Sequence, residues 1–393
     1  MSKDAIVVAA ARRTPIGSFQ GALAPVTAPE LGAAAIQAAL ADSGVGGDDL
    51  SEVLMGCVLP AALGQAPARQ AALGAGIPQG VGCTTVNKVC GSGMKATMIA
   101  HDLISAGSAD IVVAGGMESM TNAPYMLPKA RAGYRMGHQE ILDHMFFDGL
   151  QNPYDGNMMG YFAEQCVDKY GFSRDEQDAF AIESVKRARK ATRSGAVKNE
   201  IVAVNAKARK GDTVVGEDEE PECCDLDRIP TMRPAFKRDG GTVTAASSSS
   251  ISDGAAALIL MRAGEAEQRN IEPLATIIGH SGFAHAPEWF TTAPVSAIKL
   301  LQDKLGWSVH DVDLYEVNEA FACVAMAAMR DVGIDHAKLN VNGGACALGH
   351  PIGATGARIL TTLIHALRNR GLRRGIAALC IGGGEATAVA VEV

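Results

Sequence analysis

Residues 86–96, VNKVCGSGMKA, place a cysteine between a short apolar run and a segment with the length of a helix. That segment, residues 94–107 (MKATMIAHDLISAG), is apolar on nearly every face and ends at Gly107, which predicts a buried helix. Cys90 therefore falls at or just before a helix N-terminus. Free backbone N–H groups, the helix dipole and the nearby Lys88 all favour a thiolate there, so we expect a lowered pKa and a reactive thiol. The alternative is a buried structural cysteine, because free cysteine is among the most buried residue types.

The composition indicates a large globular α/β protein. The chain has 393 residues, of which 48% are hydrophobic, and this length is sufficient for two or three packed units with large cores. The 44 glycines and the aromatic content of only 5% fit a tightly packed α/β protein with many turns. A net charge of -8 argues against nucleic acid or an anionic membrane surface as the main partner. This net charge is compatible with a local basic patch that binds a phosphorylated ligand.

The cysteines and the N-terminal region predict the compartment. Nine cysteines are scattered over the chain without CxxC spacing and without a zinc motif, which indicates reduced thiols and no metal site. No apolar run of signal-peptide length precedes Arg12, and no stretch reaches about 18 uncharged apolar residues. We therefore expect a soluble cytoplasmic protein.

Strands and helices alternate along the first part of the chain, which predicts βαβ units and a parallel sheet. Thr27 and Glu30 have the spacing of a capping box, and Gly44 is placed to end the helix that follows them. The expected strands are residues 5–11, 48–60, 83–86 and 110–116, and a second expected helix is residues 65–73.

The middle of the chain, residues 120–244, differs in character. It contains scattered prolines and charge runs such as GEDEEPE, together with a polar helical pattern over residues 173–195. This indicates an insertion that is partly helical and partly loop. Long loops in compact domains are usually functional, so we expect a lid or an oligomer contact.

The two ends of the chain share a weak internal repeat. VNKVCGSGMKA followed by IVVAGG in the first part is echoed by VNGGACALGHPIGATGARI followed by IAALCIGGG in the second. DDLSEVLMG is likewise echoed by HDVDLYEVNE. Such self-similarity predicts two copies of one βαβ-rich unit, which would place equivalent loops side by side.

These equivalent loops carry chemically useful side chains. His350 lies in GHPIG before an amphipathic helix, Cys380 ends a short strand before three glycines, and Asn318 ends another strand. With Cys90, they would converge at the sheet edge where α/β proteins usually bind ligands. Each alone has a plainer interpretation: a single histidine is more often structural, and CIGGGEA resembles a phosphate loop that lacks the lysine of a P-loop.

Together the motifs NKVCGSGMKA, VNEAFA, GGACALGHPIGATGARI and CIGGGEATA resemble the thiolase family, in particular its acetyl-CoA acetyltransferases, over essentially the full chain. The resemblance implies an α/β fold with two similar βαβαβαββ halves in a five-layered α/β/α/β/α core and an inserted loop domain. It also implies a homo-oligomer, with a tetramer contact near residues 123–137. The expected units are an N-terminal half (residues 1–119, completed by 245–270), an insertion (120–244) and a C-terminal half (271–393).

The same resemblance implies the reaction and the role of each catalytic residue. Two acetyl-CoA molecules would condense reversibly to acetoacetyl-CoA and CoA by a ping-pong mechanism, with coenzyme A thioesters as substrates and no permanently bound cofactor. Cys90 matches the acylated nucleophile, His350 its activating base and Cys380 the acid/base for the second substrate. His350 with a water held by Asn318 matches one oxyanion hole, and the backbone N–H groups of Cys90 and Gly382 match the other.

Substrate-binding positions also follow from the resemblance. Phe290 matches a bulky residue that floors a short acyl pocket. Two departures concern CoA recognition: Met158 stands where bacterial relatives commonly carry histidine, and no arginine stands beside the adenine, so that Arg228, Arg233 or Lys237 would contact phosphate. The expected lining residues are Leu150, Met158, Met159, Phe236, Ala245, Ser249, Phe290, Ala320 and Phe321.

Three alternatives share the fold. A 3-ketoacyl-CoA thiolase of fatty-acid β-oxidation would have a broader chain-length range. A non-catalytic acyl-CoA or lipid carrier would have lost one of Cys90, His350 and Cys380, yet all three are present. A ketoacyl synthase typically has a Cys-His-His or Cys-His-Asn set, which Cys380 argues against; fold alone does not decide among these.

Overall fold

The computed structural model describes residues 2, 4–207 and 211–393, and in this part of the chain ten strands form one continuous sheet. The strands pair in the order β12-β13-β14-β11-β1-β10-β5-β3-β4, and the short β2 pairs with β10. Their bounds are β1 (Ile6–Arg13), β2 (Gly17–Ser18), β3 (Glu52–Gly56), β4 (Gly82–Val86), β5 (Ile111–Ser119), β10 (Ser252–Arg262), β11 (Ala275–Ala284), β12 (Leu314–Val317), β13 (Arg374–Ile381) and β14 (Glu385–Glu392).

The sheet has two arms that meet at β1. On one side β1 pairs with β10 over most of its length, whereas on the other side it pairs with β11 only from Ile6↔Ile277 to Val8↔Ala275. We call β1, β10, β5, β3 and β4 the N-terminal arm, and β11 to β14 the C-terminal arm. Each arm contains a parallel pairing, β3 with β4 and β5 in one and β12 with β13 in the other.

The prediction of a parallel sheet is therefore wrong in part, because each arm is mixed. β10 lies antiparallel between β1 and β5. β13 and β14 are joined by the glycines at 382–384, and a connection this short permits only antiparallel pairing.

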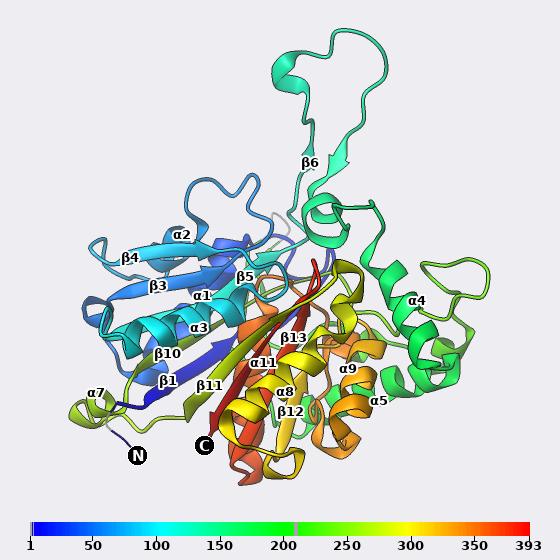
Figure 1. Ribbon diagram of the computed structural model, residues 1–393. Helices are drawn as coiled ribbons and strands as arrows, with labels where there is room; N and C mark the ends of the chain where they lie inside the picture. The colour runs from blue at the N-terminus through cyan, green and yellow to red at the C-terminus, as the bar shows by residue number, and fades with distance from the viewer. Residues whose placement is uncertain (1, 3, 208–210) are drawn as a thin grey trace.

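Two helices form the middle layer of the molecule. α3 (Ser92–Ser105) and α11 (Thr355–Arg370) pack on each other, α3 against β3, β5 and β10, and α11 against strands of both arms (Figure 1). Their shared core includes Met94, Leu258, Leu360 and Leu379, all nearly inaccessible to solvent. A helix in a central layer covered on both sides is buried around its circumference, and α11 is buried at every position from Thr355 to Leu367.

Two further pairs of helices cover the outer faces of the sheet. α1 (Ala28–Ser43) and α2 (Pro67–Gly74) pack on the N-terminal arm, and α8 (Ala293–Leu305) packs on the C-terminal arm beside α9 (Ala322–Ala328). The order of layers is thus helix, sheet, helix, sheet, helix, which confirms the predicted thiolase-type architecture. The predicted capping box of α1 is also confirmed, with Thr27 and Glu30 bonded reciprocally and Gly44 left-handed at its end.

One detail of α3 differs from the prediction of a helix buried on nearly every face. Its first three turns are buried, but His101 is only half-buried and Asp102 is exposed in its last turn. The C-terminal end of α3 therefore reaches solvent.

Residues 120–244 lie to one side of the core as a set of small elements. β6 and β7 pair as an antiparallel hairpin whose long loop stands away from the body (Figure 1). On this arrangement we propose the division into residues 1–119 with 245–270, 120–244 and 271–393. The elements are β6 (Tyr125–Met126), β7 (Leu142–Asp143), η3 (Met145–Leu150), α4 (Met159–Tyr170), α5 (Arg174–Arg193), β8 (Val204–Ala206), β9 (Thr213–Val215), α6 (Glu220–Cys223) and η4 (Leu226–Thr231).

Short helical segments complete the connections of the fold. They are η1 (Gly47–Asp49), η2 (Ala130–Ala132), α7 (Ala263–Gln268), η5 (Pro287–Thr292), η6 (Val309–Asp311), η7 (Met329–Gly333), η8 (His336–Lys338) and α10 (Ala345–Leu348). Among the described residues, no helix combines the length and the apolar character needed to cross a membrane.

Candidate active site

A mostly apolar cavity of about 360 Å³ lies where loops from both arms meet the insertion. All but one of the predicted catalytic and lining residues line it, and the exception, Asn318, contacts a lining residue. Those lining it are Cys90, Leu150, Met158, Met159, Phe236, Ala245, Ser249, Phe290, Ala320, Phe321, His350, Cys380 and Gly382. Segments far apart in the sequence thus contribute to one enclosed site.

Cys90 is held in a strained turn between β4 and α3. The preceding Val89 has φ +46°, a left-handed conformation that is unusual for a β-branched residue. Two neighbours fix the turn: Val89 N–H donates to Asn87 Oδ1 (2.9 Å), and Ser92 Oγ accepts from Lys88 N–H (2.9 Å) while donating to the Val89 carbonyl (2.6 Å). The strain is therefore held by local hydrogen bonds, and the thiol faces the cavity.

The charge state of Cys90 differs from the prediction. Enclosure in the cavity raises the pKa of Cys90 to about 11, although the backbone N–H groups of Gly382 and of Cys90 itself favour the thiolate and oppose this rise. Lys88 does not assist, because its ammonium pairs with Glu385. The predicted lowering of the pKa is wrong for this reason: the desolvation penalty exceeds the favourable dipoles.

His350 lies in the turn between α10 and α11. Gly349 before it has φ +99°, and a Cβ there would lie 2.0 Å from Ser252 Oγ, so this position requires glycine. Thr355 Oγ1 donates its single proton to the Pro351 carbonyl (3.0 Å) and must therefore accept from His350 Nδ1–H (2.6 Å). Nε2 consequently carries the lone pair.

Burial, with a smaller contribution from the Arg358 charge, lowers the pKa of His350 to about 3. The imidazole is thus neutral at neutral pH and can accept a proton at Nε2. Asn318 Nδ2 lies 3.5 Å from this nitrogen. Asn318 Oδ1 is buried and has no hydrogen-bond partner among the described residues, so it is available to a ligand or a water.

Cys380 is the penultimate residue of β13 and is almost fully buried. Burial, followed by the neighbouring Cys90 thiol, raises its pKa. Gly382 follows in the turn to β14, where an added Cβ would meet only Met159 and Val89 at 3.7 Å. The two thiols therefore share one cavity, and the cavity is open next to Gly382.

Glu118 supports the site and was not predicted. Its carboxylate accepts from the backbone N–H groups of Val58 (3.0 Å), Leu59 (3.0 Å) and Gly353 (2.8 Å). Burial, opposed by these bonds, raises the pKa of Glu118 to about 7. The side chain ties the loop after β3 to the turn that carries His350. A carboxylate directly after the apolar run IVVAGGM was the signal available in the sequence.

Aromatic side chains enclose the apolar end of the cavity. Phe290 in η5 is buried, and its ring centroid lies 6.5 Å from those of Phe162 and Phe321. Phe236 packs edge-on to Phe321 and lies directly over Gly160, where a Cβ would be 2.2 Å from its ring. This wall leaves room for a small acyl group beside the thiols.

The residues predicted to bind CoA line the same cavity, and Phe236 and Phe321 among them also belong to its aromatic wall. Ser249 donates from both its backbone N–H (3.0 Å) and its Oγ (3.1 Å) to the Ala320 carbonyl, which fixes the lining loop. Arg228 and Arg233 are exposed and do not line the cavity, and Lys237 pairs with Asp168 at 3.3 Å. The two arginines can therefore contact phosphates only outside the cavity, and Lys237 already has a partner.

This arrangement can support acyl transfer through a thiol. It combines a nucleophile, a neutral imidazole with a free lone pair, a second thiol and backbone N–H groups directed at the reacting sulfur, which are the components that such a reaction needs. Within the described residues, the group of histidine and carboxylate side chains that could share a metal ion lies elsewhere.

Comparison with known proteins gives a consistent result. The family descriptions "Thiolase, N-terminal domain" and "Thiolase, C-terminal domain" match residues 6–264 and 271–393. The chain is 48% identical to an acetyl-CoA acetyltransferase of Chromobacterium violaceum, over 98% of this chain and 99% of that protein. It is 49% identical to acetyl-CoA acetyltransferase 2 of Arabidopsis thaliana, over 100% and 97%. The crystal structure of the Bacillus anthracis acetyl-CoA acetyltransferase superimposes with a TM-score of 0.96 at 41% identity, over 99% and 98%.

Proposed function

The chain belongs to the thiolase family and is an acyltransferase, and we propose that it catalyses the reversible condensation of two acetyl-CoA molecules to acetoacetyl-CoA and CoA. The observation that carries this proposal is the meeting of Cys90, His350 and Cys380 in one enclosed cavity. The full-length likeness to acetyl-CoA acetyltransferases supports the choice of substrate.

In the first half-reaction, His350 Nε2 takes the proton of Cys90, and the thiolate attacks the carbonyl carbon of acetyl-CoA. The carbonyl oxygen accepts hydrogen bonds from the backbone N–H groups of Cys90 and Gly382. The bond to the CoA sulfur then breaks, and Cys380 protonates the departing thiolate. Acetyl-Cys90, an imidazolium and a Cys380 thiolate remain, so the charges of the last two balance within the cavity.

In the second half-reaction, the Cys380 thiolate removes an α-proton from a second acetyl-CoA. The enolate oxygen is stabilised by the imidazolium of His350 and by a water that Asn318 holds. The enolate carbon attacks the acetyl group on Cys90, and the released thiolate recovers its proton from His350. All three side chains return to their starting protonation states, which the shifted pKa values of the isolated site favour.

Chain-length preference follows from the aromatic wall. Phe290 is buried at the acyl end of the cavity with Phe162 and Phe321 against it, which supports a preference for acetoacetyl-CoA over longer ketoacyl-CoA substrates. We also propose that the protein has no permanently bound cofactor. Its proposed role is in fatty acid metabolism.

We also propose a homotetramer in the cytoplasm. The loop between β6 and β7 exposes apolar side chains, with Met136 91% and Ile141 62% accessible, and β4 is an edge strand with partly exposed side chains. Both features favour contact with other copies of the chain. The nine cysteines are all free thiols, which fits a reducing compartment. Light scattering after gel filtration gives the oligomeric state, and a monomer would contradict this assignment.

A steady-state assay tests the function. The purified protein is supplied with CoA and either acetoacetyl-CoA or 3-ketohexadecanoyl-CoA, and acetyl-CoA formation is followed. We expect rapid cleavage of acetoacetyl-CoA and much slower cleavage of the long substrate. Equal rates would indicate a broad-range 3-ketoacyl-CoA thiolase, and no cleavage of either would contradict the enzyme assignment.

A further inference from the structure

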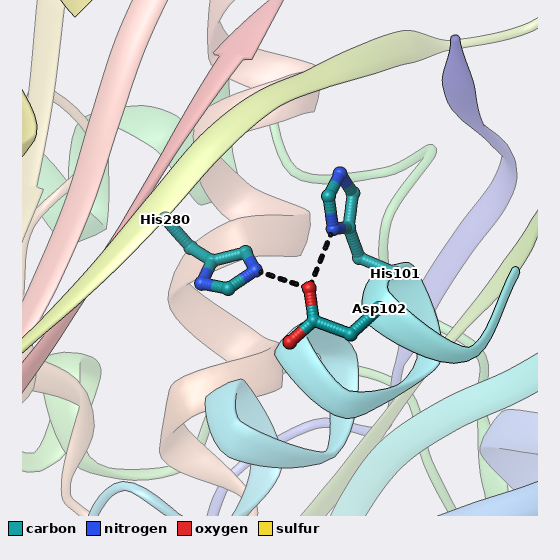
Figure 2. A group of neighbouring side chains, drawn as sticks. All are labelled: His101, Asp102 and His280. Carbon is teal, nitrogen blue, oxygen red and sulfur yellow. Dashed lines mark hydrogen bonds and ion pairs between the residues drawn. The ribbon is translucent and has the colours of Figure 1, made fainter. Parts of the chain in front are cut away.

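Three polar side chains meet at the end of α3 that lies away from the cavity (Figure 2). His101 and Asp102 come from the last turn of α3, and His280 comes from β11. From Ser92 to His101 the helix rises by about 14 Å, since each residue adds about 1.5 Å. The cluster is therefore remote from Cys90, and it joins a helix packed on the N-terminal arm to a strand of the C-terminal arm.

Both imidazole rings point at the same oxygen of the carboxylate (Figure 2). His280 Nε2 lies 2.9 Å from Asp102 Oδ1, and His101 Nδ1 lies 3.2 Å from it. Each of the three residues offers one possible ligand atom, and these three atoms all lie within 4.8 Å of one another. The ring centroids are 5.1 Å apart and the two rings are nearly perpendicular.

Two of these distances are close to those around a bound transition metal, and the third, between the two ring nitrogens, is at most 4.8 Å. Zinc bonds to histidine nitrogen and carboxylate oxygen are about 2.0–2.2 Å, which places the ligand atoms of a tetrahedral site roughly 3.3–3.5 Å apart. The two distances from Asp102 to the rings need to lengthen by only a few tenths of an ångström. The backbone already holds the ligands in place, because they come from a helix and a strand.

The chemistry of this set also fits a divalent ion. The Asp102 carboxylate accepts hydrogen bonds from both His280 and His101, and a carboxylate supplies the negative charge that a divalent ion needs. The exposed fraction of the Asp102 side chain is 58%, whereas those of His101 and His280 are 20% and 15%. Ion entry is therefore possible from solvent, and water can complete the coordination.

We propose that His101, Asp102 and His280 bind one divalent transition-metal ion of the zinc type, which ties the C-terminal end of α3 to β11. Two imidazoles and one carboxylate are a common ligand set for such ions, with a solvent molecule in the remaining position. This goes beyond the proposed acyl transfer and does not depend on it.

Binding replaces hydrogen bonds by coordination without any redox step. In the metal-free cluster both ring nitrogens that face Asp102 carry protons, since an ionised carboxylate can only accept. On binding, each ring presents a lone pair to the ion and carries its proton on the other nitrogen. Two cations lie nearby and oppose the binding of a further positive charge: Lys304 donates to the His280 carbonyl (3.3 Å), and Arg262 donates to the carbonyls of Ile104 and Ser105 at the end of α3.

Titration with Zn²⁺ and Co²⁺ tests the proposal. The full-length protein is titrated calorimetrically with Zn²⁺, and Co²⁺ is used for its visible spectrum. We expect one ion per chain at this site and a higher midpoint of thermal unfolding. His101→Gln and His280→Gln should each weaken binding by about tenfold or more. His310→Gln, an exposed histidine in η6, is the matched control and should bind as the wild type does.

Two further measurements distinguish metal binding at this cluster from a hydrogen-bonded bridge and from binding by thiols. Asp102→Asn keeps an oxygen that can accept from both rings but removes the charge, so a purely structural bridge would survive while metal binding weakens. Cysteines elsewhere would give Co²⁺ a thiolate charge-transfer band in the near ultraviolet, which this site cannot give. Absence of binding, equal binding by His280→Gln, or a spectrum from thiolate ligands alone would each overturn the proposal.

Discussion

A cluster of titratable side chains lies at each end of α3, and the two clusters have opposite surroundings. At the N-terminal end, enclosure keeps the reacting groups neutral: the pKa of Cys90 is about 11 and that of His350 about 3. At the C-terminal end, solvent and two imidazoles keep Asp102 ionised. Burial thus makes one end suitable for proton transfer between neutral groups, and exposure makes the other suitable for holding a charge.

The largest expected effect comes from removing the nucleophile at the buried end. Cys90→Ala should lower kcat for acetoacetyl-CoA cleavage by about 10⁴-fold or more, because no other group can carry the acyl intermediate. Steady-state kinetics measures this, and circular dichroism checks that the variant is folded. Activity within tenfold of the wild type would remove Cys90 from the mechanism.

A pH profile tests how strongly enclosure acts on the same thiol. Alkylation of Cys90 by iodoacetamide, followed by peptide mass spectrometry in a Cys380→Ser background, should accelerate by about tenfold per pH unit from neutral pH toward 10. The thiolate fraction rises in this way below a pKa of about 11. A plateau near pH 7 would instead show that the helix N-terminus exceeds the cost of burial.

Asn318 gives a smaller effect at the same end. Asn318→Ala should lower kcat by about 10²-fold, because it removes the group that holds an oxyanion-stabilising water. The acylation rate of Cys90 by acetyl-CoA should change much less, since that step uses the backbone N–H groups. Equal losses in both steps would mean that Asn318 only supports the local structure.

A substitution at Phe290 tests whether the aromatic wall of the cavity limits the acyl chain length. Phe290→Leu should raise the ratio of activity on 3-ketohexanoyl-CoA to that on acetoacetyl-CoA by about tenfold, because a smaller side chain admits further methylenes. Phe283→Leu, a half-buried position outside the cavity lining, serves as the control and should leave the ratio unchanged. No change in Phe290→Leu would show that another residue limits chain length.

The smallest effect is expected at the exposed end. His280→Gln without added metal should leave kcat within about twofold of the wild type, because the cluster lies far along α3 from Cys90. The free energy of unfolding should fall by about 1 kcal/mol, the typical contribution of one hydrogen bond. Urea unfolding measures it, and a large loss of activity would mean that the two ends are coupled.

The sequence predicted the parts of the fold that local chemistry determines. Thr27, Glu30 and Gly44 fix the ends of α1 through hydrogen bonds within a few residues, and the motifs around Cys90 and His350 contain their own turn glycines. The internal repeat correctly placed the loops of the two halves in one site. The helix ends and the turns depend on neighbours in the sequence, whereas the meeting of the loops followed from the repeat.

Features that depend on distant neighbours were not predicted. The ion pair of Lys88 with Glu385 joins residues 297 positions apart, so the sequence did not show that the Lys88 charge already has a partner. The thiol is enclosed by η5 and by the insertion, including the start of α4. No local pattern in the sequence reveals this enclosure. Glu118 and Thr355 were missed for the same reason, because each acts on a loop whose position only the tertiary structure defines.

Intact-mass and peptide analysis after incubation with acetyl-CoA alone tests the acyl-transfer mechanism most directly. Wild type, Cys90→Ser and Cys380→Ser are compared under the same conditions. We expect one acetyl group on Cys90 in the wild type and in Cys380→Ser, and none in Cys90→Ser. An acetyl group on another residue, or no acetylation of the wild type, would contradict the mechanism.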